Sequence, residues 1–314
     1  MKKVKLAIVI PVFNDWASAK KLLENIASEF SMHHPDCEAS VFLINDGSSE
    51  EPPVNLTLSS ISQNVEVIEL SLNVGHQRAI SAGLNYVSHL DYDYVLVMDS
   101  DGEDTPEGAV MLLNQIAISP ASVIVAQRGI RSEKWSFRAM YAAHKFIFRA
   151  LIGQTLDFGN FALLPMAAVR KINSFADSSS HFPSSILRSG IELLRVRVDR
   201  GARYFGESKM NFEKLVAHSF SSLAVFSDKI MVRLMIFSFF SIIASFIAIT
   251  LVLITRFFTD SATPGWATAA IGLILVMSIQ VLSFVGLGTL ITLNLNSLKT
   301  LYRNQERSIV NKKS

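Results

Sequence analysis

The chain is poor in charge and in cysteine. Of its 314 residues, 18% are charged and 50% are hydrophobic, a balance too apolar for an ordinary soluble domain. Cys37 is the single cysteine, which excludes an intrachain disulfide and a cysteine-rich zinc site and fits a reducing compartment. A net charge of +2 implies no nucleic-acid partner. The sequence holds no G-x-G-x-x-G fingerprint, which argues against a dinucleotide oxidoreductase.

The apolar excess is concentrated in two uncharged runs, Leu234–Thr255 and Trp266–Leu293. At 1.5 Å rise per residue the first is about 33 Å long, close to the hydrocarbon thickness of a bilayer. Buried helices of soluble proteins seldom reach this length without a polar face. We therefore predict transmembrane helices at 232–256 and 266–293, followed by a basic cytoplasmic tail at 294–314.

Basic residues flank the two predicted spans on the side away from their short connection. They are Lys229, Arg233, Lys299, Arg303, Arg307, Lys312 and Lys313. By the positive-inside rule, both termini and the catalytic domain are expected in the cytoplasm of a multi-pass membrane protein. A bacterial inner membrane is the expected location, with membrane lipid as a partner.

The first 209 residues alternate short β-branched runs with helical patterns, which is typical of βαβ units and a mostly parallel sheet. The expected strands are Leu6–Val12, Ser40–Ile44, Val65–Leu70, Tyr94–Met98, Ser122–Ala126 and Leu193–Val198. The expected helices are Trp16–Phe30, Gly75–His89, Glu107–Ile118, Trp135–Leu151 and, weakly, Pro52–Ser62. The predicted fold class is thus α/β, with one domain at 1–209.

Between this domain and the first span, hydrophobic residues recur every three or four positions, from Phe212 to Ile230. This periodicity predicts an amphipathic helix at 210–231. Two placements fit it, the bilayer surface and the α/β core. Adjacency to the predicted span favours the membrane.

The strongest local signal is an apolar strand that ends in acidic residues. Four carboxylates follow it, at Asp99, Asp101, Glu103 and Asp104. Carboxylates this close repel one another unless a cation lies among them. Ligands bind at the carboxyl ends of strands in open α/β sheets, and Mg²⁺ or Mn²⁺ prefers oxygen ligands shared with phosphates. Asp99 and Asp101 are therefore expected to hold a metal that bridges a diphosphate, whereas Asp104 is expected to begin a helix.

Two other expected strands end in polar residues, at Asn14-Asp15 and at Asn45-Asp46-Gly47. Alone, each is only a turn. In a parallel sheet, these ends converge with Asp99 on one crevice.

Four ordered motifs resemble the family 2 glycosyltransferases. They are Ile8–Asp15, Ile44–Ser48, Asn73–Gln77 with Ala79 and Gly83, and Met98–Asp101. The two-helix tail and the segment Arg203–Lys209 resemble the branch that includes dolichol-phosphate mannose synthase and bacterial polyprenyl-phosphate glucosyltransferases. Two positions depart from the family pattern, because Asn45 stands where an Asp is usual and Asp15 where a Glu is common.

The resemblance implies a GT-A fold, a UDP- or GDP-sugar donor, and inversion at the anomeric carbon. By position it implies that Pro11, Phe13 and Asp15 line the nucleoside pocket and that Asp46 contacts the base. It places Asp99 near the ribose and the metal, with Asp101 and Glu103 completing the metal site.

The favoured acceptor is polyprenyl phosphate, either undecaprenyl or dolichyl. Its phosphate is already anionic near neutral pH, so no general base is required. The enzyme must instead clamp this phosphate with cations. The candidates are Arg128, Arg131, Arg203 and Lys209. The product would serve the biosynthesis of cell-envelope glycans, and a flippase and a second copy of the chain are further candidate partners.

Two alternatives remain open. A hydroxyl acceptor on a lipid-linked glycan would need a carboxylate base, and Asp157 is best placed for it by family position. Asn160, where the family often has an acid, cannot serve as a base. Alternatively, the chain is a membrane scaffold that has lost catalysis, although the retained Asp99, Asp101 and Glu103 argue against decay. His76, His144, His181 and His218 are scattered and are expected to be structural or surface residues.

Overall fold

The computed structural model describes residues 3–53, 64–128, 135–175, 179–206, 212–259 and 265–310. The chain divides into two compact units. The first comprises residues 1–148 and 154–225, and the second comprises residues 149–153 and 226–314. The predicted Pro52–Ser62 helix falls almost wholly outside the described residues.

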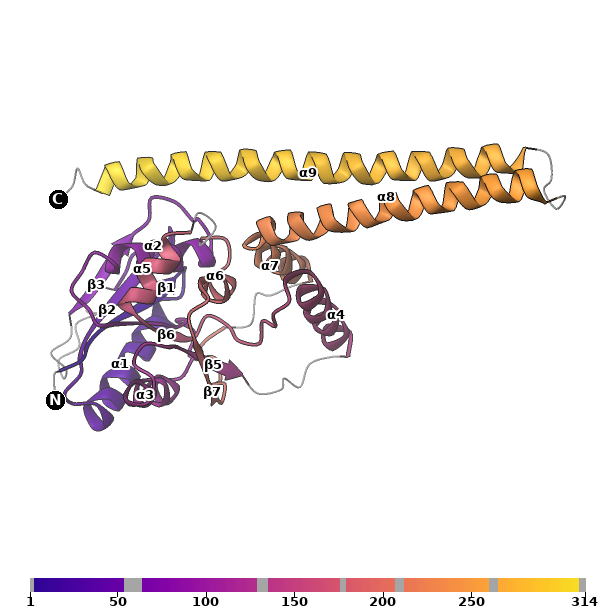
Figure 1. The fold of residues 1–314 in the computed structure, drawn as a ribbon. Coiled ribbons are helices and arrows are strands. Elements are labelled where there is room, and N and C mark those ends of the chain that lie inside the picture. Colours follow the sequence, from indigo (N-terminus) through magenta and orange to yellow (C-terminus); the bar gives the residue numbers. More distant parts are fainter. Residues whose placement is uncertain are drawn as a thin grey trace. The chain divides into compact units, whose positions relative to one another are not determined.

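The first unit is built on a sheet of seven strands (Figure 1). They are β1 (Lys5–Val12), β2 (Glu38–Asn45), β3 (Val65–Glu69), β4 (Tyr94–Val97), β5 (Val123–Arg128), β6 (Ala162–Pro165) and β7 (Leu193–Val198). Their order is β3-β2-β1-β4-β6-β5-β7, and only β6 runs antiparallel to its neighbours. The mostly parallel α/β sheet expected from the sequence is confirmed. β6 was not predicted, because it has only four residues and three of them are buried.

Seven α-helices of the described residues belong wholly or mainly to this unit. They are α1 (Trp16–His33), α2 (His76–Val87), α3 (Pro106–Asn114), α4 (Trp135–Ile152), α5 (Met166–Asn173), α6 (Phe182–Ser189) and α7 (Phe212–Ala224), and a 3₁₀ turn, η1 (Gln115–Ala117), extends α3. α5 and α6 were not predicted, since each spans only eight residues. The predicted amphipathic helix is divided, because α7 ends at Ala224 and the next helix begins at Ser227.

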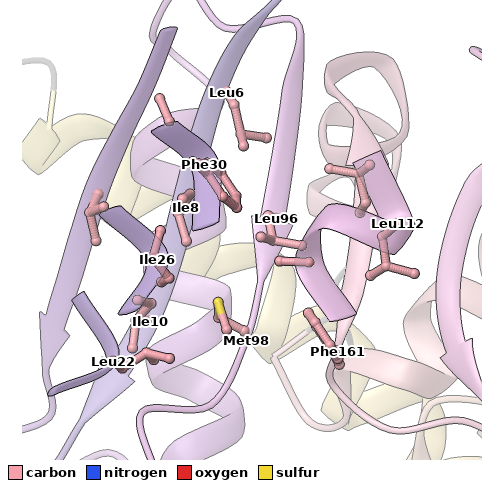
Figure 2. Packing of buried hydrophobic residues seen from close by; sticks show 14 of the residues in the cluster. Leu6, Ile8, Ile10, Leu22, Ile26, Phe30, Leu96, Met98, Leu112 and Phe161 are labelled. Carbon is pink, nitrogen blue, oxygen red and sulfur yellow. The ribbon is translucent and has the colours of Figure 1, made fainter. Parts of the chain in front are cut away.

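The core lies on both faces of the sheet. On one face, alternate β1 residues such as Ile8 and Ile10 pack with Leu22 and Ile26 of α1 (Figure 2). Strand pleating points the intervening residues to the opposite face. There α2 approaches so closely that a Cβ on Gly83 would lie 2.6 Å from Cγ1 of Val9. The two helices fix the sheet from both sides and so hold the ends of its strands in place.

α7 packs against α6 within the first unit. The Nε2 atoms of His218 on α7 and His181 before α6 lie 3.1 Å apart. Arg188 also donates a hydrogen bond to the carbonyl of Val225. Of the two placements considered for the amphipathic segment, packing against the α/β core therefore applies to the face of α7 that carries His218. Phe220 of the same helix remains 68% exposed.

The second unit contains two long helices, α8 (Ser227–Phe258) and α9 (Trp266–Val310), which lie side by side (Figure 1). Ser227–Phe258 and Trp266–Thr292 are long and apolar enough to cross a membrane. The residues predicted as a tail continue α9 as far as Val310. Arg233 of α8 donates a hydrogen bond to the carbonyl of Ala150, near the C-terminus of α4.

Candidate active site

The polar ends of three adjacent parallel strands meet at one edge of the sheet. β1 lies between β2 and β4 and is parallel to both. The turns after these strands carry Asn14, Asp46 and Asp99. The convergence predicted from the sequence is thus a property of the strand order, and this edge is where open α/β sheets bind ligands.

Asp46 builds the turn that leads into α2. Its Oδ1 accepts a hydrogen bond of 2.7 Å from the backbone of Val74, and its Oδ2 accepts one of 3.1 Å from Gly75. Next to it, Gly47 has a φ of +65°, and a Cβ there would lie 2.6 Å from the nitrogen of Asn73. Asp46 is only 3% exposed, so its contact with a base stays a prediction while its structural role is visible.

The unusual Asn45 has a local explanation. Its Nδ2 donates a 2.6 Å hydrogen bond to Oε2 of Glu69, its register partner on β3. Its Oδ1 accepts from the backbone of Ser48. An aspartate at this position would offer Glu69 a second acceptor in place of the donor.

The predicted nucleoside pocket is partly open at the end of β1. Pro11 is buried within the strand, whereas Phe13 is 44% exposed. Asn14 has a φ of +49°, and its Oδ1 accepts from the backbone of Ser49 at 2.8 Å. Asp15 precedes α1 without making a side-chain capping bond to it. Phe13 and Asp15 therefore present an aromatic face and a carboxylate at this edge.

The acidic turn after β4 is shaped by Asp104. This side chain is 1% exposed and accepts a 2.9 Å hydrogen bond from the backbone of Asp99. Thr105 caps α3 by accepting from the nitrogen of Gly108, and Pro106 occupies the first turn. The sequence analysis expected Asp104 to begin the helix, but the N-cap is Thr105, one residue later, and Asp104 instead holds the turn before the helix.

Two arginines pair with Asp101 and Glu103, two further carboxylates of the turn. Nη2 of Arg203 lies 2.7 Å from Oδ2 of Asp101, and its Nε lies 3.1 Å from Oε1 of Glu103. Arg200 pairs with Oε2 of the same glutamate. The sequence analysis expected Arg203 to bind an acceptor phosphate, but its guanidinium here bridges two carboxylates.

The backbone joins the same two segments. Gly201 donates a 3.0 Å hydrogen bond to the carbonyl of Glu103, and Tyr204 donates one of 2.9 Å to that of Asp101. Gly102 has a φ of +85° and lies under the ring of Tyr204. A Cβ added to Gly102 would lie 2.6 Å from Cε2 of that ring. The segment 200–204 therefore adds to the hydrogen bond of Asp104 in holding the acidic turn.

The donor set for a metal is incomplete in the protein alone. Within the described ranges, no three His, Cys, Asp or Glu residues are grouped so that they could hold a metal ion. Both oxygens of Glu103 are taken by arginines. Asp99 and Asp101 still supply carboxylates of the kind that Mg²⁺ and Mn²⁺ prefer, and such ions usually complete their shell with substrate phosphates.

His76 and Asn160 adjoin Asp99, which the sequence did not lead us to expect. Nε2 of His76 lies 3.1 Å from Oδ1 of Asp99, and Nδ2 of Asn160 lies 3.4 Å from the same oxygen. Burial alone would lower the pKa of the His76 imidazole, but the charge of Asp99 and its neighbouring carboxylates raises it above its usual value. The place of His76 in the Asn73–Gln77 motif was the one sequence signal that could have indicated this.

Asp157, the candidate base, is held between two strands. Its Oδ2 accepts from Nε2 of Gln127 on β5 at 2.9 Å, and both of its oxygens lie 3.1 Å from Nε of Arg195 on β7. Arg128 is the last residue of β5. Arg131 and Lys209 lie outside the described residues.

Curated relatives match most of the chain. The uncharacterized glycosyltransferase YkcC of Bacillus subtilis (strain 168) is 26% identical over 276 residues, which cover 85% of this chain and 82% of that protein. The undecaprenyl-phosphate 4-deoxy-4-formamido-L-arabinose transferase of Sodalis glossinidius (strain morsitans) is 27% identical over 224 residues, covering 69% of this chain and 66% of that one.

Solved structures share the fold. Mannosyl-3-phosphoglycerate synthase from Rubrobacter xylanophilus matches with a TM-score of 0.51 at 12% identity, covering 72% of this chain and 74% of its own. A second match, with a TM-score of 0.51 at 13% identity, is glucosyl-3-phosphoglycerate synthase from Mycobacterium tuberculosis in complex with Mn²⁺, UDP-glucose and phosphoglyceric acid. It covers 72% of this chain and 80% of its own. These neighbours confirm the GT-A architecture expected for the first unit. A sequence model of glycosyl transferase family 2 matches residues 7–175, and the chain therefore belongs to this family.

Proposed function

We propose that this glycosyltransferase moves a sugar from a UDP- or GDP-sugar to polyprenyl phosphate, with inversion and with Mg²⁺ or Mn²⁺ as cofactor. The observation that carries the proposal is that Phe13, Asp46 and Asp99 follow the carboxyl ends of three adjacent strands, in a chain that also has two helices long enough to cross a membrane. An aromatic face, buried hydrogen-bonding groups and carboxylates are what a nucleoside diphosphate and its metal require.

On the donor side, Pro11, Phe13 and Asp15 would bind the nucleoside, with Asp46 towards the base. Asp99 would contact the ribose and share the metal with Asp101. The Mycobacterium tuberculosis neighbour was crystallised with Mn²⁺ and UDP-glucose, which supports this arrangement by analogy. A bound cation would neutralise the leaving diphosphate. Glu103 would join the metal only if it gave up its arginine partners.

On the acceptor side, the Sodalis relative is named for undecaprenyl phosphate, which supports the same class of acceptor here. An anionic phosphate oxygen needs no base, only cations that hold it in line with the anomeric carbon. Arg128, Arg131 and Lys209 are the proposed clamp. Arg203 would contribute only if it left Asp101.

The alternative, a hydroxyl acceptor, requires Asp157 to take a proton. Its oxygens are engaged by Arg195 and Gln127, which favours a structural role for this carboxylate. We therefore retain the phosphate acceptor as the proposal. The second unit would anchor the enzyme in a bacterial inner membrane with the first unit in the cytoplasm, and a flippase would move the product across.

A donor and acceptor screen tests the proposal. The purified full-length chain would be incubated with Mn²⁺, labelled UDP- and GDP-sugars, and undecaprenyl phosphate. The expected result is a labelled lipid that is hydrolysed by mild acid, and none from the Asp101→Asn variant. Product only from a lipid that bears a free hydroxyl would refute the phosphate acceptor. Absence of Mn²⁺-dependent nucleotide binding in calorimetry would instead support an inactive scaffold.

A further inference from the structure

We propose that Gln77 is a positioning residue that orients the Asn160 amide so that its N–H group faces Asp99. The inference rests on the proposed function, because it concerns the carboxylate that we assign to donor and metal binding. It assigns a role to a side chain that neither the metal site nor the acceptor clamp uses.

The orientation of Gln77 follows from a backbone donor. Phe182 donates a 2.6 Å hydrogen bond to Oε1 of Gln77. A backbone N–H can only donate, so the oxygen of the Gln77 amide must face Phe182. Its Nε2 then points the other way, where it donates a 3.0 Å hydrogen bond to Oδ1 of Asn160.

The same logic fixes Asn160. With its oxygen accepting from Gln77, its Nδ2 is left to face Oδ1 of Asp99 at 3.4 Å. The same Nδ2 lies 3.0 Å from Nε2 of His76, which can accept from it only when that nitrogen carries no proton. Amide orientations are normally inferred from the surrounding network. Here one unambiguous donor, the Phe182 amide, determines two successive side chains. The result is an N–H group directed at a carboxylate instead of a carbonyl oxygen that would repel it.

The start of α6 explains why the Phe182 amide is available. The side chain of His181 accepts from the backbone of Ser184, and Pro183 has no N–H to offer. Ser185 donates to the carbonyl of His181. Gln77 therefore satisfies the remaining N–H of the first turn, at a residue that is 1% exposed. Because Phe182 is buried, its backbone N–H is a rigid anchor for Gln77. Through Asn160, Gln77 then links α2 and α6 to the carboxylate after β4.

A fixed Asp99 carboxylate would contribute mainly to donor binding. If the Asn160 amide turned over, its oxygen would face Oδ1 of Asp99, and repulsion would rotate the carboxylate away from this position. The loss of one hydrogen bond to a charged group corresponds to about a tenfold weaker affinity. The donor KM should rise by a similar factor, while kcat at saturating donor should change little.

The Gln77→Glu variant tests this with minimal change of shape. Glutamate still accepts from Phe182 but presents an oxygen to Oδ1 of Asn160 and so favours the turned-over amide. The full-length chain would be titrated with Mn²⁺ and whichever of UDP and GDP the wild type binds more tightly, and we expect the dissociation constant from calorimetry to rise about tenfold. The matched control is Gln115→Glu in η1, with the same charge change at a residue outside the site, which should leave affinity unchanged.

A double-mutant cycle with Asn160→Ala separates positioning from mere packing. If Gln77 acts through Asn160, Gln77→Glu should weaken nucleotide binding little further in the Asn160→Ala background. If the fold-losses in affinity of the two single variants multiply in the double variant, the inference is overturned. An unchanged affinity in Gln77→Glu would overturn it as well. Should Gln77→Glu not fold, Gln77→Ala in the same cycle gives the same discrimination. A wild-type chain that binds no nucleotide would refute the proposed function and this inference together, whereas binding with multiplied effects refutes the inference alone.

Discussion

Replacing Glu103 with glutamine removes the shared partner of Arg200 and Arg203 and should destabilise the first unit. The Glu103 side chain is 12% exposed, and those of Arg200 and Arg203 are 28% and 29% exposed. Exposed ion pairs contribute about 0–1 kcal/mol, and breaking a fully buried pair costs about 3–5 kcal/mol. Glutamine keeps one acceptor oxygen, so we expect a loss of about 1–2 kcal/mol. For a unit of this size, the unfolding midpoint should fall by about 2–8 °C.

The assay is thermal unfolding of the detergent-solubilised full-length chain, followed by tryptophan fluorescence, because Trp16 is buried in the first unit. Glu107→Gln is the control, since Glu107 is an exposed carboxylate in the first turn of α3 and its loss should cost only a few tenths of a kcal/mol. Mn²⁺-dependent binding of UDP should change by less than about threefold, because Glu103 is occupied by arginines. An unchanged midpoint together with abolished Mn²⁺ binding would show that Glu103 is a metal ligand and that this reasoning fails.

Three further changes test other parts of the structure. Gly83→Ala should lower the unfolding midpoint, because its Cβ would meet Val9 and cost about 1–2 kcal/mol after the gain in helix propensity; a higher midpoint would contradict the close approach. Asn45→Asp should cost up to about 1 kcal/mol of stability, because a carboxylate would then face the Glu69 carboxylate across β2 and β3 in place of the amide donor, and an unchanged unfolding midpoint would exclude charge repulsion. Burial, helped by the adjacent negative charge, raises the pKa of Cys37 to about 11, so at pH 8 iodoacetamide should label the native thiol about 100-fold more slowly than the unfolded one; comparable rates would contradict this.

The sequence was sufficient to predict the strands and helices whose hydrophobic residues recur in a clear pattern. All six predicted strands coincide with observed strands, namely β1 to β5 and β7, to within two residues at each end, because apolar β-branched runs are bounded by turn residues. β6 escaped prediction since a four-residue buried strand shows no alternation and ends at Pro165. α6 escaped because a helix of eight residues with three serines and a proline carries little periodic signal.

The candidate site was predictable where its residues directly follow a strand in the sequence. Asp46 and Asp99 follow apolar strands directly, so their convergence follows from a parallel sheet. The partners of the acidic turn were not predictable, because Arg203 and Glu103 are separated by 100 residues and a sequence pattern says nothing about which charges meet. Asp157 looked like a base by position, and only the structure shows its pairing with Arg195.

The attachment of the segment 200–204 to the acidic turn has a consequence for how the enzyme is completed. The matched family region ends at residue 175, yet the cations that neutralise Asp101 and Glu103 come later in the chain, at Arg200 and Arg203. During synthesis, the acidic turn emerges first and keeps its mutual repulsion until about a hundred further residues have left the ribosome. A fragment cut at the family boundary would carry every expected donor-site carboxylate and still lack the counter-charges that hold them in place.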